Sequence, residues 1–541
     1  MQIDPVKLTK QNPLIDDYRQ NRQRIMQHFD YNPYSEAALE KRLASLNERK
    51  FDRRRLSEAL TSMNKKWGAP ESAYRNIKRL EQEDSAVVIG GQQAGLLTGP
   101  IYTINKIISI IQFAKKQEVK LGKPIIPVFW IAGEDHDFDE INHIYLPENY
   151  SMKKHTIQHR ITEKRSLSDI PIDKTHAEKW VHHIFEQLKE TAFTNQLYES
   201  IYDCLQKSNT YVDFFARFIH HLFETEGIVL ADSGDPEIRK LESDHFITLI
   251  NKQPEISKGV YQSVQTLNQK NYPVSLEVDG QDGHLFLLKD HERILLTRHE
   301  NGEWAGKQNE LVLSEQELLD IAAENPAQLS NNVVTRPVMQ EMLFPTLAFV
   351  GGPGEVSYWA ALKPAFHAAE VEMPPVLPRL SFTFMEKRVE KALNSYGIQA
   401  EQVINNGAGD LKANWLAAQN NPPVKHLASE IKDAIAKVHA PLKEVASEVR
   451  TDLGELADRN LFYLQRDIDF MEGRIRKAME EKYAKELSEF SLVEMALHPN
   501  NGLQERTWNP VSFLNKYGSG FIEQLTNEIC SFDHDHFIVY I

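Results

Sequence analysis

The chain has 541 residues, 41% of them hydrophobic and 26% charged, which is an ordinary globular composition in a chain too long for one core. Its 62 Lys and Arg residues against 77 Asp and Glu residues give a net charge of -15, which argues against a nucleic acid or an anionic membrane as the main partner. Cys204 and Cys530 form no motif, and no segment approaches the roughly 20 apolar residues that span a bilayer, so we expect a cytoplasmic protein.

Four strand–loop–helix units follow a predicted helical lead-in of 84 residues. Their strands are short apolar runs, predicted at 86–89, 125–131, 227–231 and 347–350. The second run is apolar throughout, as in a parallel strand buried on both faces. These units predict an α/β fold with a Rossmann-type parallel-sheet core, interrupted by a helical insertion near 150–226 and a mixed one near 250–340.

The C-terminal third contains a coiled-coil pattern. Apolar residues recur at alternating spacings of four and three, at Ile431, Ile435, Val438, Leu442, Val445, Val449, Leu453 and Leu456. The pattern slips and then resumes at Leu461, so a stutter in one long helix and a hairpin near Gly454 both fit. We expect this seam to pair with the same helix of a second copy, making a homodimer.

These patterns predict three regions. Residues 1–393 form the Rossmann-type core with its insertions, and residues 394–495 form the helical coiled-coil domain. Residues 496–541 return to the core and end in a strand at 537–541.

The loop after the first strand is rich in glycine. Between a strand and a helix, backbone N–H groups and the helix dipole can hold a phosphate or a carboxylate. The loop matches neither G-x-G-x-x-G nor a complete P-loop, so a simple tight turn is the alternative. Its polar content favours a nucleotide site, in which Lys106, one turn into the helix, could reach a phosphate. The predicted cofactor-binding residues are Gly90, Gly91, Gln92, Gln93, Thr98 and Gly99.

Acidic residues and histidines follow the second strand, where ligands of open α/β sheets bind. Glu134, Asp135 and His136 could hold an ammonium group or accept a proton from an amine, and Asp137 and Asn142 are candidate substrate-binding residues. A metal site made of Asp135, His136 and His143 and a solvated acidic loop are the alternatives. Since the spacing matches no standard zinc signature, no metal ligand is predicted.

The fourth unit supplies a second glycine-rich turn and a cation. Arg336 precedes the strand, and Gly352, Glu355 and Tyr358 follow it. A guanidinium group near a glycine-rich turn is suited to an anionic acceptor.

Five blocks resemble one family. They are GGQQAGLLTGPIYTINK, VFWIAGEDHDFDEIN, RPVMQEMLFPTLAFVGGPGEVSYWA, PRLSF and HPNNGLQERTWNP, in this order over most of the chain. They resemble the bacillithiol biosynthesis cysteine-adding enzymes. The family also looks like a distant relative of class I nucleotidyltransferases, although the stretch from Leu97 to Pro100 keeps a glycine and has neither histidine of their H-x-G-H motif.

The resemblance implies a ligase that joins the carboxyl group of cysteine to the amine of glucosaminyl malate. Such a reaction needs an activated carboxyl group, so ATP with Mg²⁺ is the implied co-substrate. With the glycine loop holding the nucleotide, the predicted catalytic residues are Lys106, Glu134, Asp135 and His136. Arg336, Gly352, Glu355 and Tyr358 are predicted to bind the acceptor, and Asn501, Gly502 and Arg506 to complete the pocket.

Two other functions fit the same sequence. One is a nucleotide-dependent synthetase for another amino acid. The other is a non-catalytic nucleotide-binding scaffold that works through its coiled coil.

Overall fold

The computed structural model describes residues 1–541 apart from 160, 162–164, 291, 309 and 421–422. The chain divides into two compact units. The first contains Met1–Leu146, Met152–Phe384 and Gln504–Ile541, and the second contains Pro147–Ser151 and Met385–Leu503. Among the described residues, none of the helices combines the length and the apolarity needed to cross a membrane.

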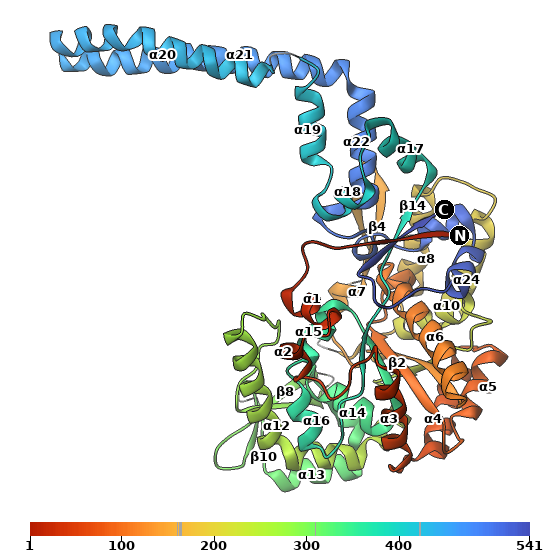
Figure 1. Ribbon diagram of the computed structural model, residues 1–541. Helices are drawn as coiled ribbons and strands as arrows, with labels where there is room; N and C mark the ends of the chain where they lie inside the picture. Colours follow the sequence, from red (N-terminus) through yellow and green to blue (C-terminus); the bar gives the residue numbers. More distant parts are fainter. Residues whose placement is uncertain (160, 162–164, 291, 309, 421–422) are drawn as a thin grey trace. The chain divides into compact units, whose positions relative to one another are not determined.

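A five-stranded parallel sheet forms the centre of the first unit (Figure 1). Its order is β13 (Val376–Pro378), β12 (Thr346–Gly351), β2 (Ala86–Gln92), β3 (Ile125–Ile131) and β6 (Val229–Asp232). All four neighbouring pairs are parallel. The sheet confirms the predicted fold class and its four strands, and β13 is a fifth strand that the sequence did not predict.

Helices connect and cover the strands. Helix α6 (Tyr102–Leu121) packs against β2 and β3, and its isoleucines are buried there. Helices α14 (Thr335–Leu343) and α15 (Pro353–Trp359) precede and follow β12. The predicted helical lead-in consists of α1 (Pro13–Arg19), α2 (Gln23–Met26), α3 (Glu36–Asn47), α4 (Arg53–Lys66) and α5 (Glu71–Arg79).

Two groups of elements separate the strands of the sheet along the chain, one between β3 and β6 and one between β6 and β12. The first contains α7 (Phe138–Ile141), β4 (His143–Glu148), β5 (Ser151–Thr156), α8 (Lys174–Gln187), α9 (Thr194–Gln206) and α10 (Tyr211–Leu222). The second joins helices α11 (Pro236–Leu241), α12 (Ser243–Gln269) and α13 (Glu315–Glu324) to an antiparallel sheet. That sheet has the order β10 (Val312–Leu313), β9 (Trp304–Gly306), β8 (Glu292–Arg298), β7 (Asp282–Lys289) and β11 (Leu329–Asn331).

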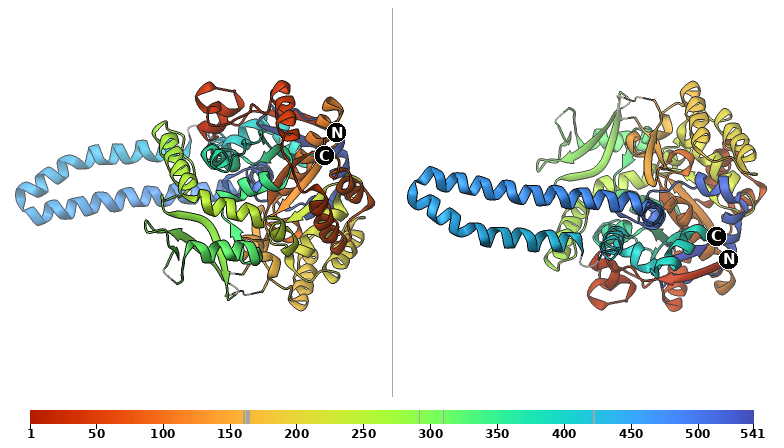
Figure 2. Two further views of the ribbon diagram at one scale, coloured as in Figure 1. Left: turned by 90° about the horizontal axis from the view of Figure 1, so that it is seen from below. Right: turned by 90° about the horizontal axis from the view of Figure 1, so that it is seen from above.

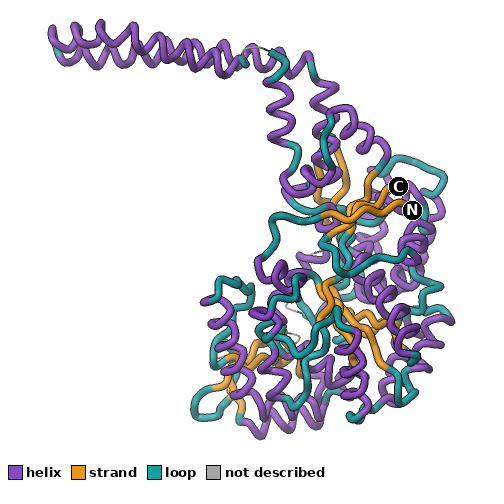
Figure 3. Tube along the Cα trace, viewed as in Figure 1, coloured by secondary structure: helices purple, strands orange, loops and turns teal. Residues whose placement is uncertain are grey.

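The two chain ends pair with each other. Strand β1 (Gln2–Val6) lies antiparallel to β15 (His536–Tyr540), which also neighbours β14 (Phe382–Met385) (Figure 3). The predicted C-terminal strand is thereby confirmed. The expectation that the whole N-terminal stretch is helical was wrong for β1, because this strand is stabilised by a partner more than 500 residues away that no local pattern shows.

Helices make up the second unit: α17 (Lys387–Tyr396), α18 (Ala400–Asn406), α19 (Gly409–Ala417), α20 (Val424–Val449), α21 (Thr451–Lys482) and α22 (Ala484–Leu497). Helices α20 and α21 lie side by side (Figures 1 and 2). Lys443 pairs with Asp458 and Lys432 with Asp469, both at 2.6 Å, which fixes an antiparallel register. Of the two alternatives, the hairpin is therefore the one observed, and the chain reverses at Arg450, close to Gly454.

The apolar seam predicted on α20 does not face α21. Ala428 and His439 are buried in the hairpin, whereas Val438 and Val449 are 81% and 70% exposed and Leu442 is 61% exposed. The hairpin thus uses small and polar residues for its own contact and leaves a row of large apolar side chains uncovered within the chain. The homodimer stays a prediction.

Candidate active site

Two adjoining cavities lie beside the carboxyl ends of the parallel strands. The first, of about 380 Å³, is lined from the ends of β2, β3, β12 and β13, and the second, of about 390 Å³, from the start of α6. They share Gln92, Gln93, Tyr102 and Arg506. Because β2 is the first strand of the sheet and the later strands lie on both sides of it, this edge is the topological switch point where open α/β sheets bind their ligands.

The glycine loop leads from β2 into the second cavity. Leu97, Thr98 and Gly99 all have left-handed backbone conformations, with φ of 47°, 73° and 70°. The buried side-chain amide of Asn509 holds them there, donating to the carbonyl oxygens of Leu97 at 3.1 Å and Gly99 at 2.7 Å. Strain of this kind persists only where surrounding contacts enforce it, and it is common at binding sites.

Helix α6 begins directly after this loop. Gly99, Pro100 and Thr103 line the second cavity, and no side chain of the described residues caps the helix. The first turn therefore presents the positive end of the helix dipole to the cavity. The predicted loop residues Gln92, Gln93, Thr98 and Gly99 line this cavity.

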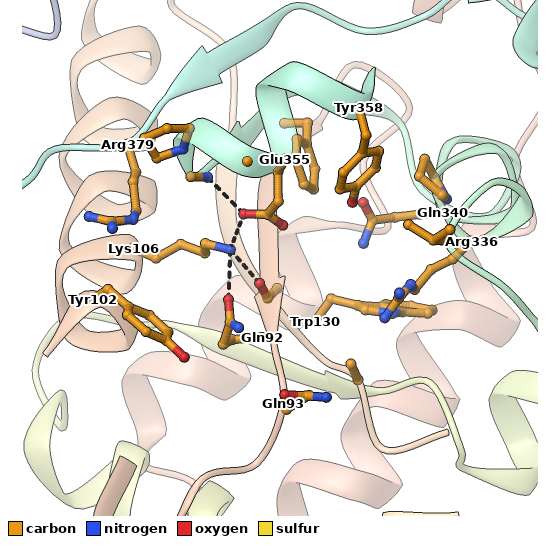
Figure 4. Close-up of a pocket in the computed structure, with 18 of the residues that line it drawn as sticks. Gln92, Gln93, Tyr102, Lys106, Trp130, Arg336, Gln340, Glu355, Tyr358 and Arg379 are labelled. Carbon is orange, nitrogen blue, oxygen red and sulfur yellow. Dashed lines mark hydrogen bonds and ion pairs between the residues drawn. The ribbon is translucent and has the colours of Figure 1, made fainter. Parts of the chain in front are cut away.

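Lys106 lies at the centre of the first cavity (Figure 4). Its ammonium group is buried and donates to the Gly91 carbonyl at 2.6 Å, to Oε1 of Gln92 at 3.1 Å and to Oε2 of Glu355 at 2.5 Å. Burial lowers the pKa of Lys106, and the Glu355 carboxylate opposes that shift. Glu355 also accepts the Gly352 N–H at 2.7 Å, so one carboxylate joins α6 to the start of α15.

Asp135 is the residue of the acidic cluster after β3 that lines the first cavity. Its carboxylate lies 3.5 Å from Arg336 and 3.8 Å from Arg293, and Gln93 donates to it at 3.5 Å. Burial disfavours a charged Arg336, but Asp135 and Glu134 outweigh it and raise the pKa of the guanidinium above its ordinary value. Asp135 is thus a carboxylate that lines the first cavity between two guanidinium groups.

The segment around Ser168 holds the loop that presents Asp135. Oγ of Ser166 donates to the Gly133 carbonyl at 2.6 Å, and the Leu167 N–H donates to the Asp135 carbonyl at 2.8 Å. Oγ of Ser168 donates to Asp232 at 2.7 Å. A Cβ on Gly133 would collide with Ser168, so only glycine allows this close approach.

Several predicted residues line neither cavity. Glu134 is buried in an ion pair with Arg239 at 2.5 Å, and His136 faces Arg293, with 3.2 Å between Nδ1 and the guanidinium. Asp137 is exposed, Asn142 bonds to Asp139 at 2.9 Å, and Gly90 packs within the sheet. Asn501 and Gly502 belong to the second unit, and their predicted role stays a prediction. Among the described residues there is no group of three or more His, Cys, Asp or Glu placed to hold a metal.

Other cavity residues escaped sequence reasoning, above all Arg379. It directly follows β13 and lines the first cavity (Figure 4). Glu505 binds it through two contacts of 2.7 Å. Asn105 donates to the same carboxylate at 2.6 Å. Burial alone would raise the pKa of Glu505, but Arg379 overrides it and lowers the pKa to about 2. Arg379 and Glu505 lie in the sequence blocks PRLSF and LQERTWNP, which were the only signal that could have found them.

The first cavity nevertheless gathers ten predicted residues from distant parts of the chain: Gly91, Gln92, Gln93, Lys106, Asp135, Arg336, Gly352, Glu355, Tyr358 and Arg506. Burial raises the pKa of Tyr358, which keeps its hydroxyl group protonated. A doubly wound sheet with such a polar cavity at its switch point defines a Rossmann-type α/β enzyme.

Comparison with known proteins gives the family. The model described as Bacillithiol biosynthesis BshC, N-terminal Rossmann-like domain, matches residues 1–380, and the model of the C-terminal coiled-coil domain matches residues 382–541. Curated relatives from Oceanobacillus iheyensis, Geobacillus sp. and Bacillus cytotoxicus are 41%, 40% and 39% identical over the whole of both chains. Each is named "Putative cysteine ligase BshC". The chain belongs to the BshC family of bacillithiol biosynthesis, and it is a ligase.

Proposed function

We propose that this ligase joins the carboxyl group of cysteine to the amine of glucosaminyl malate in the cytoplasm, forming bacillithiol. The observation that carries the proposal is the first cavity, in which an amine-binding carboxylate and several cations lie together at the switch point. Asp135 supplies the carboxylate, and Lys106, Arg336, Arg379 and Arg506 supply the cations. An acceptor that combines an amine with carboxylates needs both kinds of group.

The second cavity is the proposed site of the nucleotide. Its wall is the glycine loop and the first turn of α6, and a Cβ on Gly95 would lie 2.8 Å from the Gly99 Cα, so the backbone itself forms this surface. Such a wall fits phosphate oxygens, and about 390 Å³ lies within the usual range for small-molecule sites. ATP with Mg²⁺ is the expected co-substrate, with the ion held by the phosphates. Bound there, ATP supplies the energy that activates the cysteine carboxyl group.

The amide then forms where the cavities adjoin. The amine nitrogen forms a bond to the carboxyl carbon, the bond to the leaving group breaks with its electron pair, and the amine gives up a proton. Asp135 is the carboxylate of the first cavity that we assign to this role, since its contacts with Arg336 and Arg293 are 3.5 Å and 3.8 Å long, whereas Glu355 lies 2.5 Å from the Lys106 ammonium group. Gln93 positions Asp135 by donating a hydrogen bond to it. Glu134 does not line the cavity and forms an ion pair with Arg239.

The test is to measure nucleotide cleavage with cysteine and, in parallel, with serine. AMP with pyrophosphate would identify an adenylate, and ADP with phosphate an acyl phosphate. We expect cleavage that depends on cysteine. Equal cleavage with serine would instead favour a synthetase for another amino acid, and nucleotide binding without cleavage would favour a scaffold.

A further inference from the structure

One side of the first cavity is lined by side chains that donate hydrogen bonds. Arg336 and Gln340 lie one turn apart on α14, and Trp130 lies on β3. In Figure 4 these residues and Tyr358 lie on the opposite side of Lys106 from Tyr102 and Arg379.

The donors on this side are largely unused. The indole N–H of Trp130 is buried and has no hydrogen-bond acceptor among the described residues. The Gln340 side chain, 5% exposed, lines the same side of the cavity with an amide that can donate. Within the residues that the structure describes, Arg336 has one ion pair, the 3.5 Å contact with Asp135. An indole and a guanidinium group can only donate, so this wall requires a ligand rich in acceptors.

The charges of the cavity also favour an anionic ligand. Lys106 is paired with Glu355, and Arg379 is paired with Glu505. Arg506 forms no ion pair within the described part of the chain, so the cations outnumber the carboxylates that meet them. A carboxylate supplies two acceptor oxygens and one negative charge, and guanidinium groups bind it well.

We propose that Trp130, Gln340 and Arg336 form a carboxylate-binding subsite that selects a short aliphatic dicarboxylate group on the acceptor. Trp130 and Gln340 are then specificity-determining residues. The subsite rests on the proposed function, in which the acceptor is a malyl glycoside. Its residues would bind the carboxylates of the malyl group.

Binding of free malate to the purified full chain tests the subsite without any turnover. Trp130→Phe removes the indole N–H and keeps an aromatic ring, and Gln340→Leu removes the amide. Each change should weaken malate binding about tenfold in calorimetry, the effect of losing one hydrogen bond to a charged group. The dimethyl ester of malate, which lacks the charges, should not bind.

Trp304→Phe is the matched control. Trp304 on β9 is also buried with an indole N–H that has no partner among the described residues, but it does not line the cavity, so its change should leave malate affinity as in the wild type. Wild-type protein that fails to bind malate, wild-type affinity in both test variants, or an equal loss in Trp304→Phe would overturn the subsite. Malate binding that depends on Trp130 in a protein that makes no bacillithiol would contradict the proposed function alone.

Discussion

The buried pair of Arg379 and Glu505 should make a large, pH-dependent contribution to stability. Glu505→Gln keeps the size of the side chain but removes its charge, leaving Arg379 buried without a counter-charge. At about 1.36 kcal/mol for each pKa unit, a folded-state pKa of about 2 against an ordinary 4.5 corresponds to about 3 kcal/mol. This agrees with the roughly 3–5 kcal/mol lost when one partner of a buried pair is removed.

The sign of the pH effect follows from the lowered pKa. The contribution is complete above pH 4.5 and is lost as the pH falls toward 2, because the unfolded chain binds the proton first. Urea unfolding should therefore show Glu505→Gln about 3 kcal/mol less stable than the wild type at pH 7, with a smaller difference at pH 3. Glu40→Gln, at an exposed position on α3, is the control. A cost under about 1 kcal/mol at pH 7, or one that does not shrink in acid, would refute the reasoning.

Three further predictions concern the active site, the hairpin and the C-terminal strand. Lys106→Met or Asp135→Asn should lower the rate of bacillithiol formation by about 100-fold or more with little change in the circular dichroism spectrum. A variant that forms bacillithiol at the wild-type rate would show that the substituted residue is not catalytic. Val438→Glu should convert a dimer to a monomer in sedimentation. Val119→Glu, which changes a residue 85% exposed on α6, should leave the dimer intact. A wild-type protein that sediments as a monomer would contradict the predicted homodimer. Burial lowers the pKa of His536 to about 4, so the stability that the neutral imidazole provides is lost as the pH falls from 6.5 toward 4. Urea unfolding of His536→Gln should therefore depend less on pH between 6.5 and 4 than unfolding of the wild type, and an unchanged pH dependence would contradict this.

The sequence predicted the parts of the fold that local patterns specify. Apolar runs followed by glycine or aspartate marked four of the five sheet strands, because buried parallel strands lack alternation. Strands β13 and β1 were missed because β13 has only three residues and β1 depends on the distant β15. The heptad pattern correctly indicated helices, but which face meets α21 depends on the hairpin register.

The site was predicted only in part for a similar physical reason. Asp135 lies in the loop that follows β3, and Lys106 lies one turn into α6, the helix that follows β2, where the fold rule places ligands. Glu134 has the same sequence signal as Asp135, yet it points into the ion pair with Arg239, a contact set by a residue more than 100 positions away. Arg379 follows β13, the strand that the sequence did not predict, and its partner Glu505 lies 126 positions further along the chain.

The central claim is tested most directly by incubating the purified protein with cysteine and glucosaminyl malate, with and without ATP and Mg²⁺, and measuring bacillithiol by mass spectrometry. The account predicts product only in the tube that contains ATP. Folded protein that binds malate and nucleotide but forms no bacillithiol in either tube would contradict it.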